Sequence, residues 1–353
     1  MADTRSTRQA RLVSLGALAI VAALILGSAW RGGGFGFSTV DVGALSSPQA
    51  TLDGSLLLLR EADGSFELVA VGLASREVLA SVALDRRPSR IVPTPGGVSA
   101  FVLWPDSNRV TVYDTGTLEV QRDVALDGVS RPIELSFSPT GEQVFVVDGD
   151  GGGVVEYRHL RLELTENRRM ELAGSGPVLT NRRATRLYRV SPQAVSVYFA
   201  QTGDLVETYP AAGMRPEGLR FDASYTALWG VDAAGNPFAV DERSGRVSLT
   251  DVAEAFRPGP AAGERVAFLS ADGRSVVTVS PREPERVEAT VELPQEALTV
   301  VAPDSSVFWA ITADGAILDV SGASARLIAD LELPGIVEAV SSPVDRAGSF
   351  ACF

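Results

Sequence analysis

Several residue types that carry chemistry in enzymes are missing or nearly missing from this chain of 353 residues. No lysine occurs, since all 31 basic residues are arginine, and this excludes a lysine nucleophile or a lysine Schiff base. The single cysteine, Cys352, cannot form a disulfide within the chain, so packing and strand pairing must hold the fold. The single histidine, His159, cannot by itself build a haem, zinc or quinone site, because such sites need several convergent ligands.

Positive charge is also in short supply overall. The formal net charge is −13, which excludes nucleic acid as an expected partner, because phosphate binding needs a concentrated basic face. Hydrophobic residues make up 45% and charged residues 21% of the chain, a globular rather than a disordered composition. The sequence contains no Ser-His-Asp set, P-loop, CxxC motif or GxGxxG after a strand.

The first long apolar run lies at the N-terminus. Residues 12–30 carry no charge over 19 residues, close to the length that spans a hydrocarbon core, and Arg5, Arg8 and Arg11 precede them. We expect residues 1–31 to be a transmembrane anchor or a cleaved signal sequence, with the rest of the chain outside the cytoplasm. The predicted location is the cell membrane with an extracytoplasmic C-terminal domain, and secretion after cleavage is the alternative. Residues 32–49 are rich in Gly and Ser and read as a linker.

From residue 50 onward the sequence repeats. Arg-Pro pairs begin at Arg87, Arg131, Arg215 and Arg257, at intervals of 44, 84 and 42 residues, so that the middle interval is two periods. Between the pairs lie short β-branched and aromatic segments separated by turns such as Ser138-Pro139-Thr140-Gly141. A period of 40–45 residues with four strands is typical of a β-propeller blade.

The fold class predicted is therefore all-β: a seven-bladed β-propeller of four-stranded blades over residues 50–353, preceded by an N-terminal transmembrane or signal helix. The blades are expected at 50–84, 85–128, 129–174, 175–213, 214–256, 257–295 and 296–336. The tail after Gly335 is expected to add inner strands to the blade whose outer strands are FELVAVGL and EVLASVAL, which would close the ring. The alternatives are that the first blade is already complete and the tail starts an eighth blade, or that the chain is incomplete.

One known family resembles this repeat. RP, FSPTG, FVV and VVEY, in order between Arg131 and Tyr157, are similar to the YVTN-type β-propeller repeat of secreted bacterial proteins. The segments from Arg87 and, more loosely, from Arg215 match the same pattern. No blade carries the literal YVTN tetrapeptide. The resemblance implies the propeller fold and an extracytoplasmic protein, and it covers proteins of many functions.

Two groups of side chains are candidates for partner binding. The first comprises Trp104, Trp229 and Trp309, near the ends of comparable strands, where aromatic rings fill space between blades or line a surface for a sugar or peptide. The second is the basic stretch NRRATRLYR. Read as one strand, it points Arg182, Arg186 and Tyr188 to one face and Arg183 and Arg189 to the other. This stretch is either a solvated strand or a patch for an anionic partner.

Two further features read as structural. His159 is interpreted as an ordinary strand histidine near the point where its strand leaves the sheet. The run Asp148-Gly149-Asp150-Gly151-Gly152-Gly153 alternates carboxylates with Gly like a calcium loop, but the twelfth position from Asp148 is His159 rather than Glu. A hairpin turn is the preferred interpretation, with a weak calcium site as the alternative.

The leading hypothesis is a membrane-anchored, extracytoplasmic propeller that binds or scaffolds a protein or glycan partner without catalysis or a cofactor. The alternative is a lactonase- or lyase-like enzyme that holds a divalent cation such as calcium between Asp and Glu at the central channel. Acidic side chains converging there would favour the enzyme, and a channel lined by apolar and Arg residues would favour the binding module. A sensor or assembly component whose membrane segment pairs with a partner helix is a third possibility.

Overall fold

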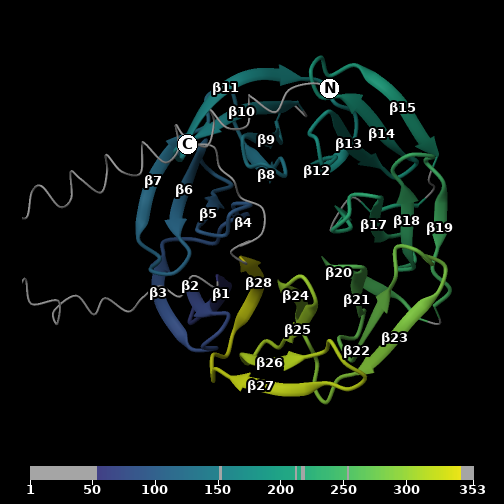
Figure 1. Cartoon of the computed structure of the whole chain (residues 1–353). Coiled ribbons are helices and arrows are strands. Elements are labelled where there is room, and N and C mark those ends of the chain that lie inside the picture. Colours follow the sequence, from purple (N-terminus) through teal and green to yellow (C-terminus); the bar gives the residue numbers. More distant parts are fainter. Residues whose placement is uncertain (1–53, 151–152, 211–212, 216–218, 253, 343–353) are drawn as a thin grey trace, which may run out of the picture. The chain divides into compact units, whose positions relative to one another are not determined.

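The computed structural model describes residues 54–342, except 151–152, 211–212, 216–218 and 253. Regular structure in these residues is entirely β, with 28 strands in seven four-stranded antiparallel sheets. All of these strands lie within one compact unit, residues 49–353. The sheets stand side by side around a ring, so the predicted seven-bladed propeller of four-stranded blades is confirmed (Figure 1).

The predicted N-terminal helix and the linker lie outside the described residues. Within the residues that the structure describes, no helix is long and apolar enough to cross a membrane.

Blades 2 to 4 follow the chain in order, each from an inner to an outer strand. Their strands are β4 (Arg90–Pro93), β5 (Ser99–Leu103), β6 (Arg109–Asp114) and β7 (Val120–Ala125) in blade 2; β8 (Pro132–Phe137), β9 (Gln143–Asp148), β10 (Val154–Leu160) and β11 (Glu163–Met170) in blade 3; and β12 (Ser175–Thr180), β13 (Arg186–Ser191), β14 (Ala194–Phe199) and β15 (Leu205–Pro210) in blade 4.

Blades 5 to 7 repeat this order. Their strands are β16 (Arg220–Phe221), β17 (Ala227–Val231), β18 (Pro237–Asp241) and β19 (Val247–Leu249) in blade 5; β20 (Phe256–Ala262), β21 (Arg265–Ser270), β22 (Ser275–Val279) and β23 (Val287–Glu292) in blade 6; and β24 (Thr299–Asp304), β25 (Val307–Ile311), β26 (Ala316–Asp319) and β27 (Arg326–Asp330) in blade 7.

Blade 1 draws strands from both ends of the described chain. Its order is β28-β1-β2-β3, where β1 is Ser55–Ala62, β2 is Ser65–Gly72, β3 is Val78–Leu84 and β28 is Ile336–Ser342. In Figure 1 the yellow β28 lies beside the purple β1. The expected closure by the tail is confirmed for one strand: the tail supplies the inner strand β28, and the second strand, β1, comes from the N-terminal end of the described residues rather than from the tail. The alternative of a first blade complete without the tail is wrong for the described residues.

Seven hydrophobic clusters hold the ring together, one at each boundary between adjacent blades. The run Leu56–Leu59 in β1 shows how one strand serves two boundaries. Leu56 and Leu58 pack toward blade 7, whereas Leu57 and Leu59 pack toward blade 2. Because successive side chains of a strand point to opposite faces, a strand buried on both faces reads as a continuous apolar run rather than an alternating one.

The outer strand of six blades meets its neighbour with the same irregularity. A one-residue register shift lies between the third and fourth strands of every blade except blade 5. A bulge at this position increases the local twist. The recurrence supports the reading of the sequence as one repeated structural unit.

Candidate functional site

A groove between blades 3 and 4 brings together charged and polar side chains from both blades, and we call it the arginine groove. Its volume is about 660 Å³. Blade 3 contributes the β8–β9 turn and parts of β9, β10 and β11, and blade 4 contributes the β12–β13 turn and the end of β14. The lining residues are Thr140, Glu142, Gln143, Glu156, Arg158, Asn167, Arg182, Arg183, Ala184, Thr185, Phe199 and Gln201.

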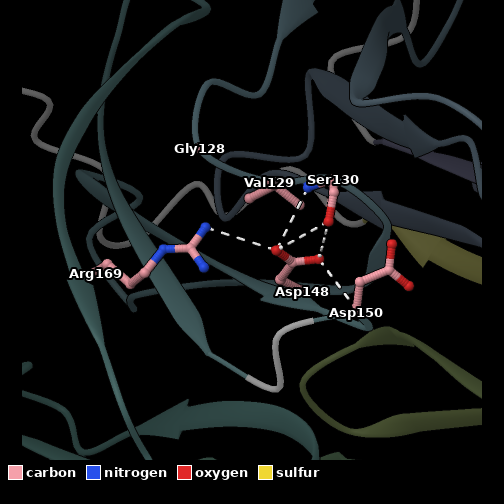
Figure 2. Close-up of a pocket in the computed structure, with 6 residues that line it drawn as sticks. All are labelled: Gly128, Val129, Ser130, Asp148, Asp150 and Arg169. Carbon is pink, nitrogen blue, oxygen red and sulfur yellow. Dashed lines mark hydrogen bonds and ion pairs between the residues drawn. The ribbon is translucent and has the colours of Figure 1, made fainter.

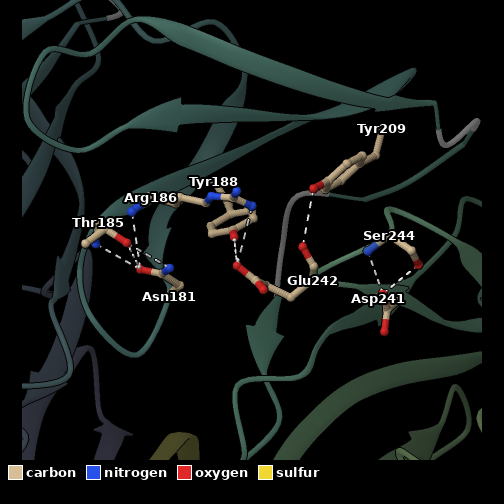
Figure 3. Close-up of polar contacts among 8 residues, drawn as sticks. All are labelled: Asn181, Thr185, Arg186, Tyr188, Tyr209, Asp241, Glu242 and Ser244. Atoms are coloured by element: carbon tan, nitrogen blue, oxygen red, sulfur yellow. Dashed lines mark hydrogen bonds and ion pairs between the residues drawn. The ribbon is translucent and has the colours of Figure 1, made fainter.

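The β12–β13 turn has its shape set by Asn181 (Figure 3). The Asn181 Oδ1 accepts hydrogen bonds from the backbone N–H groups of Thr185 at 2.9 Å and Arg186 at 3.2 Å. Asn side chains commonly stabilise turns in this way. The turn carries Arg182 and Arg183 exposed at its tip, where both line the arginine groove.

The floor of the groove is an internally neutralised carboxylate. Glu156 is buried, and its Oε2 accepts a hydrogen bond from Arg168 Nε at 2.7 Å. The side-chain amides of Asn167 and Gln143 donate to its Oε1 at 2.9 and 3.1 Å. Arg168 also donates to the backbone carbonyl of Gln201 in blade 4 and so links the two blades beneath the groove.

The walls carry positive charge without a matching acid. Arg158, Arg182 and Arg183 are exposed, and within the described part of the chain none has a carboxylate within 4.0 Å. Glu142 is the only acid of the lining besides the neutralised Glu156. Phe199, 53% exposed, adds an apolar wall. On a chain of net charge −13, this groove is a local excess of positive charge.

The predicted basic patch is divided by the structure. Because Asn181 makes a turn of residues 181–185, β13 begins only at Arg186, and the inferred alternation of faces does not apply to Arg182 and Arg183. Tyr188 is fully buried, so it cannot share an exposed surface with Arg182. Its hydroxyl donates to Glu242 Oε1 of blade 5 at 2.6 Å (Figure 3).

Arg186 joins this internal network instead of the groove. Its Nη1 lies 3.8 Å from Glu242 Oε1. Burial and the hydrogen bond to Glu242 raise the pKa of Tyr188 above its ordinary value, so the hydroxyl remains a donor. The remaining basic residue of the strand, Arg189, is buried and donates to the carbonyls of Gly176 at 2.5 Å and Gly174 at 2.7 Å. Arg186, Tyr188 and Arg189 thus join parts of the propeller to one another.

The three candidate tryptophans do not form one surface. Trp229 and Trp309 lie in the middle of β17 and β25 and are 1% and 5% exposed, packed in the clusters between blades 5 and 6 and between blades 7 and 1. Trp104 follows the end of β5, is half-buried, and donates from Nε1 to Thr111 Oγ1 at 2.9 Å. Trp104 lines a pocket of about 530 Å³, where the Arg86 guanidinium lies 5.4 Å from the centroid of its ring.

The inner strands of blades 1 to 3 carry charges near one another. Arg90 on β4 donates to both carboxylate oxygens of Glu134 on β8, at 2.5 Å from Nη2 and 3.0 Å from Nε. Burial raises the pKa of Glu338 on β28, and the nearby Arg90 and Arg87 oppose this rise. Among the described residues, no group of three or more His, Cys, Asp or Glu side chains could hold a metal ion.

His159 lies within the boundary of blades 2 and 3. Its Nδ1 is 2.7 Å from the carbonyl oxygen of Gly141, and its ring makes edge contacts with Phe101 and Phe137. It belongs to β10, one residue before the end of that strand. The contacts agree with the interpretation of a strand histidine that packs against neighbours.

Asp148 uses its carboxylate to shape a turn (Figure 2). It is buried and accepts hydrogen bonds from the Ser130 hydroxyl at 3.1 Å and from the backbone N–H groups of Arg131 and Asp150 at 3.1 and 3.3 Å. Burial works to raise its pKa, but these hydrogen bonds outweigh burial and lower it. Arg169 Nη2 lies 3.6 Å from Asp148 Oδ2. This arrangement agrees with a turn in which protein donors satisfy the carboxylate.

Comparisons with known proteins identify the fold and no family. No protein-family model matches the chain, and no curated protein matches it in sequence. Solved structures do match. The periplasmic gluconolactonase PpgL of Pseudomonas aeruginosa is 16% identical with a TM-score of 0.61, over 82% of this chain and 99% of that chain.

Two further solved structures extend the comparison. A putative 6-phosphogluconolactonase of Bacteroides fragilis is 14% identical with a TM-score of 0.59, over 84% of this chain and 99% of that one. BamB of Moraxella catarrhalis is 16% identical with a TM-score of 0.50, over 80% of this chain and 84% of that chain. At such identities the likeness establishes the propeller fold, and membership of the YVTN-type family stays a prediction.

The basic stretch predicted from the sequence and the observed groove share the arginines Arg182 and Arg183. Reasoning from sequence missed the contributions of Arg158 on β10, Phe199 at the end of β14 and Gln201 in the turn that follows β14. The repeat phase offered one usable signal. Turns between the first and second strands of neighbouring blades, at Ser138–Gly141 and at residues 181–185, fall on the same face of the ring, which brings the Arg182 turn beside blade 3.

Proposed function

We propose that this chain is an extracytoplasmic, membrane-anchored propeller that binds a protein partner through the arginine groove. The observation that carries the proposal is the pairing of three exposed guanidiniums with the exposed ring of Phe199 at a boundary between blades. Arg and aromatic side chains are the residues most enriched at protein interfaces. The anchor rests on the uncharged residues 12–30 and the arginines before them.

A protein partner is favoured over a glycan. The alternative in which the three tryptophans line one surface for a sugar or a peptide loses two of them, since Trp229 and Trp309 are buried between blades. The arginine groove instead offers guanidinium forks, side-chain amides and one apolar ring, which together suit a polypeptide.

Photo-crosslinking in living cells tests this function. Phe199 is replaced by p-benzoylphenylalanine, and the matched control carries the same group at Leu327, which is 56% exposed on the outer strand of blade 7. We expect a discrete crosslinked protein from position 199 and none from position 327. No crosslinked protein at 199, or the same products at both positions, would contradict the proposal.

A lactonase- or lyase-like enzyme is the second candidate, because a gluconolactonase and a putative 6-phosphogluconolactonase share this fold and carboxylates lie on the inner strands. Its difficulty is Arg90, which holds Glu134 by two hydrogen bonds and lies close to Glu338. A divalent cation between these carboxylates would have to displace a guanidinium. Lactone hydrolysis that depends on added calcium and is lost in Glu134→Gln would establish the enzyme instead.

A further inference from the structure

A second pocket lies on the same face of the ring as the arginine groove, and we call it the inner pocket. Its volume is about 280 Å³. It is lined by the inner strands β8, β12, β16 and β20 of blades 3 to 6 and by the turns that follow β8 and β16. The lining residues are Phe137, Pro139, Leu179, Thr180, Arg220, Phe221, Asp222, Ala223, Tyr225 and Ala261.

The turn of residues 181–185 joins the two pockets. Thr180, just before the turn, lines the inner pocket, and Arg182 to Thr185 line the arginine groove. Arg182 also lies close enough to Tyr225 of the inner pocket to act on its ionisation: burial raises the pKa of Tyr225, and Arg182 lowers it. The two pockets are therefore neighbours across one short turn.

Arginine side chains occur from the arginine groove, across the turn of residues 181–185, to the inner pocket, and we call this course the path. Arg158, Arg182 and Arg183 line the arginine groove, and Arg220 lines the inner pocket. Burial lowers the pKa of Arg220 to about 10, which still leaves it charged at neutral pH. Two of the three acids that line the two pockets, Glu156 and Asp222, are satisfied from within the protein.

In the inner pocket the carboxylate of Asp222 is satisfied by donors of the protein itself, as the carboxylate of Glu156 is in the arginine groove. Asp222 is buried and accepts hydrogen bonds from the backbone N–H groups of Thr226 at 2.7 Å and Ala227 at 2.9 Å, and from the Thr226 hydroxyl at 2.7 Å. In the lining of both pockets, Glu142 is the one acid without such partners. A ligand in the arginine groove therefore meets the guanidiniums of Arg158, Arg182 and Arg183, which have no carboxylate within 4.0 Å among the described residues.

We infer that this path takes an extended acidic segment of a protein partner, with carboxylates on Arg158, Arg182 and Arg183 and an apolar side chain on Phe199. The inference rests on the proposed function and names the chemistry of its partner. Guanidinium groups suit carboxylates because their fork geometry matches the two oxygens. An extended segment fits because the two pockets are neighbours on either side of one short turn rather than one deep cavity.

Fluorescence anisotropy with the full-length chain in detergent tests the inference. The probe is a labelled glutamate-rich peptide with one phenylalanine, and its glutamine counterpart is the neutral control. We expect the acidic peptide to bind and the neutral peptide to bind at least about tenfold more weakly, with affinity falling as salt rises.

Two double variants test whether the acidic peptide binds at the arginine groove. R182Q/R183Q is expected to weaken binding of the acidic peptide by roughly 3–30-fold, as for two solvent-exposed ion pairs. R282Q/R286Q removes two exposed arginines of the same charge from blade 6 and is expected to stay within about twofold of the wild type. Urea unfolding of both variants checks that the fold is kept.

Several results would overturn the inference. They are no binding of the acidic peptide, equal binding of the glutamine peptide, or equal weakening by the two double variants. Binding of oligogalacturonate at least as tightly as the peptide, with the same dependence on Arg182 and Arg183, would assign the path to an anionic glycan. If the acidic peptide does not bind but the crosslink at position 199 still forms, the proposed function is kept, and only the inference that the partner segment is acidic is rejected.

Discussion

The closing strand gives the sharpest test of the fold, through the change Ile336→Ala. Ile336 begins β28, is 2% exposed, and packs with Leu56, Leu58 and Trp309 at the boundary between blades 7 and 1. The change removes three carbons, at about 0.8 kcal/mol for each buried methylene. The cavity left behind adds to this loss, and the total expected is about 2–4 kcal/mol of unfolding free energy.

Urea unfolding followed by tryptophan fluorescence is the assay, since Trp309 belongs to the same cluster. The matched control is Leu327→Ala, an exposed position on the outer strand of blade 7, which is expected to cost less than about 0.5 kcal/mol. Midpoints and slopes of both variants are compared with the wild type. Equal, small shifts in the two variants would refute the claim that β28 closes the ring.

Three further predictions concern the turn, the inner strands and the membrane. Asn181→Ala removes the acceptor for the backbone N–H groups of Thr185 and Arg186, and we expect weaker acidic-peptide binding together with a loss of about 1–2 kcal/mol in urea unfolding, a loss that is absent in Asn181→Asp. Because burial raises the pKa of Glu338, its ionisation costs stability as pH rises above the unfolded-state value of about 4.3. Thermal melts should therefore show Glu338→Gln more stable than the wild type at pH 7 and equal to it at pH 4; the same difference at both pH values would contradict this. Finally, a membrane-impermeant maleimide should label the single Cys352 in spheroplasts as fully as in lysed cells, and labelling only after lysis would place the C-terminus inside.

The architecture could be predicted because short sequence patterns recur once in each blade or nearly so. Arg87-Pro88 and Arg131-Pro132 mark the approach to the inner strands β4 and β8, and the turn at Ser138–Gly141 separates β8 from β9. Such signals need only neighbouring residues. Closure of the ring by the tail was also predictable, since a ring without an unpaired edge needs strands from both ends, but the tail contributes only β28, which pairs with β1.

The site was less accessible to sequence reasoning, for two physical reasons. The stretch from Asn181 was read as one strand, but the Asn181 side chain satisfies the backbone of a turn, so the face assigned to Arg182 does not follow from β alternation. Trp229 and Trp309 were grouped with Trp104 by position, yet a shift of a few residues separates a buried strand centre from a strand end.

The arginine groove itself depends on tertiary placement. Arg158 and Phe199 are 41 residues apart and come together only because blades 3 and 4 pack side by side. Strand periodicity assigns a face within one blade and does not say which residues meet across a boundary. The repeat phase could locate the turn of residues 181–185 on one face of the ring, but not the partners of its arginines.

The most direct test of the central claim is the yield of the crosslink at position 199 in cells that carry R182Q/R183Q or R282Q/R286Q. Both backgrounds lose two positive charges, and only the first loses them from the arginine groove. We expect the yield to fall several-fold in R182Q/R183Q and to remain at the wild-type level in R282Q/R286Q. The same yield in both backgrounds would contradict a partner held by the arginine groove.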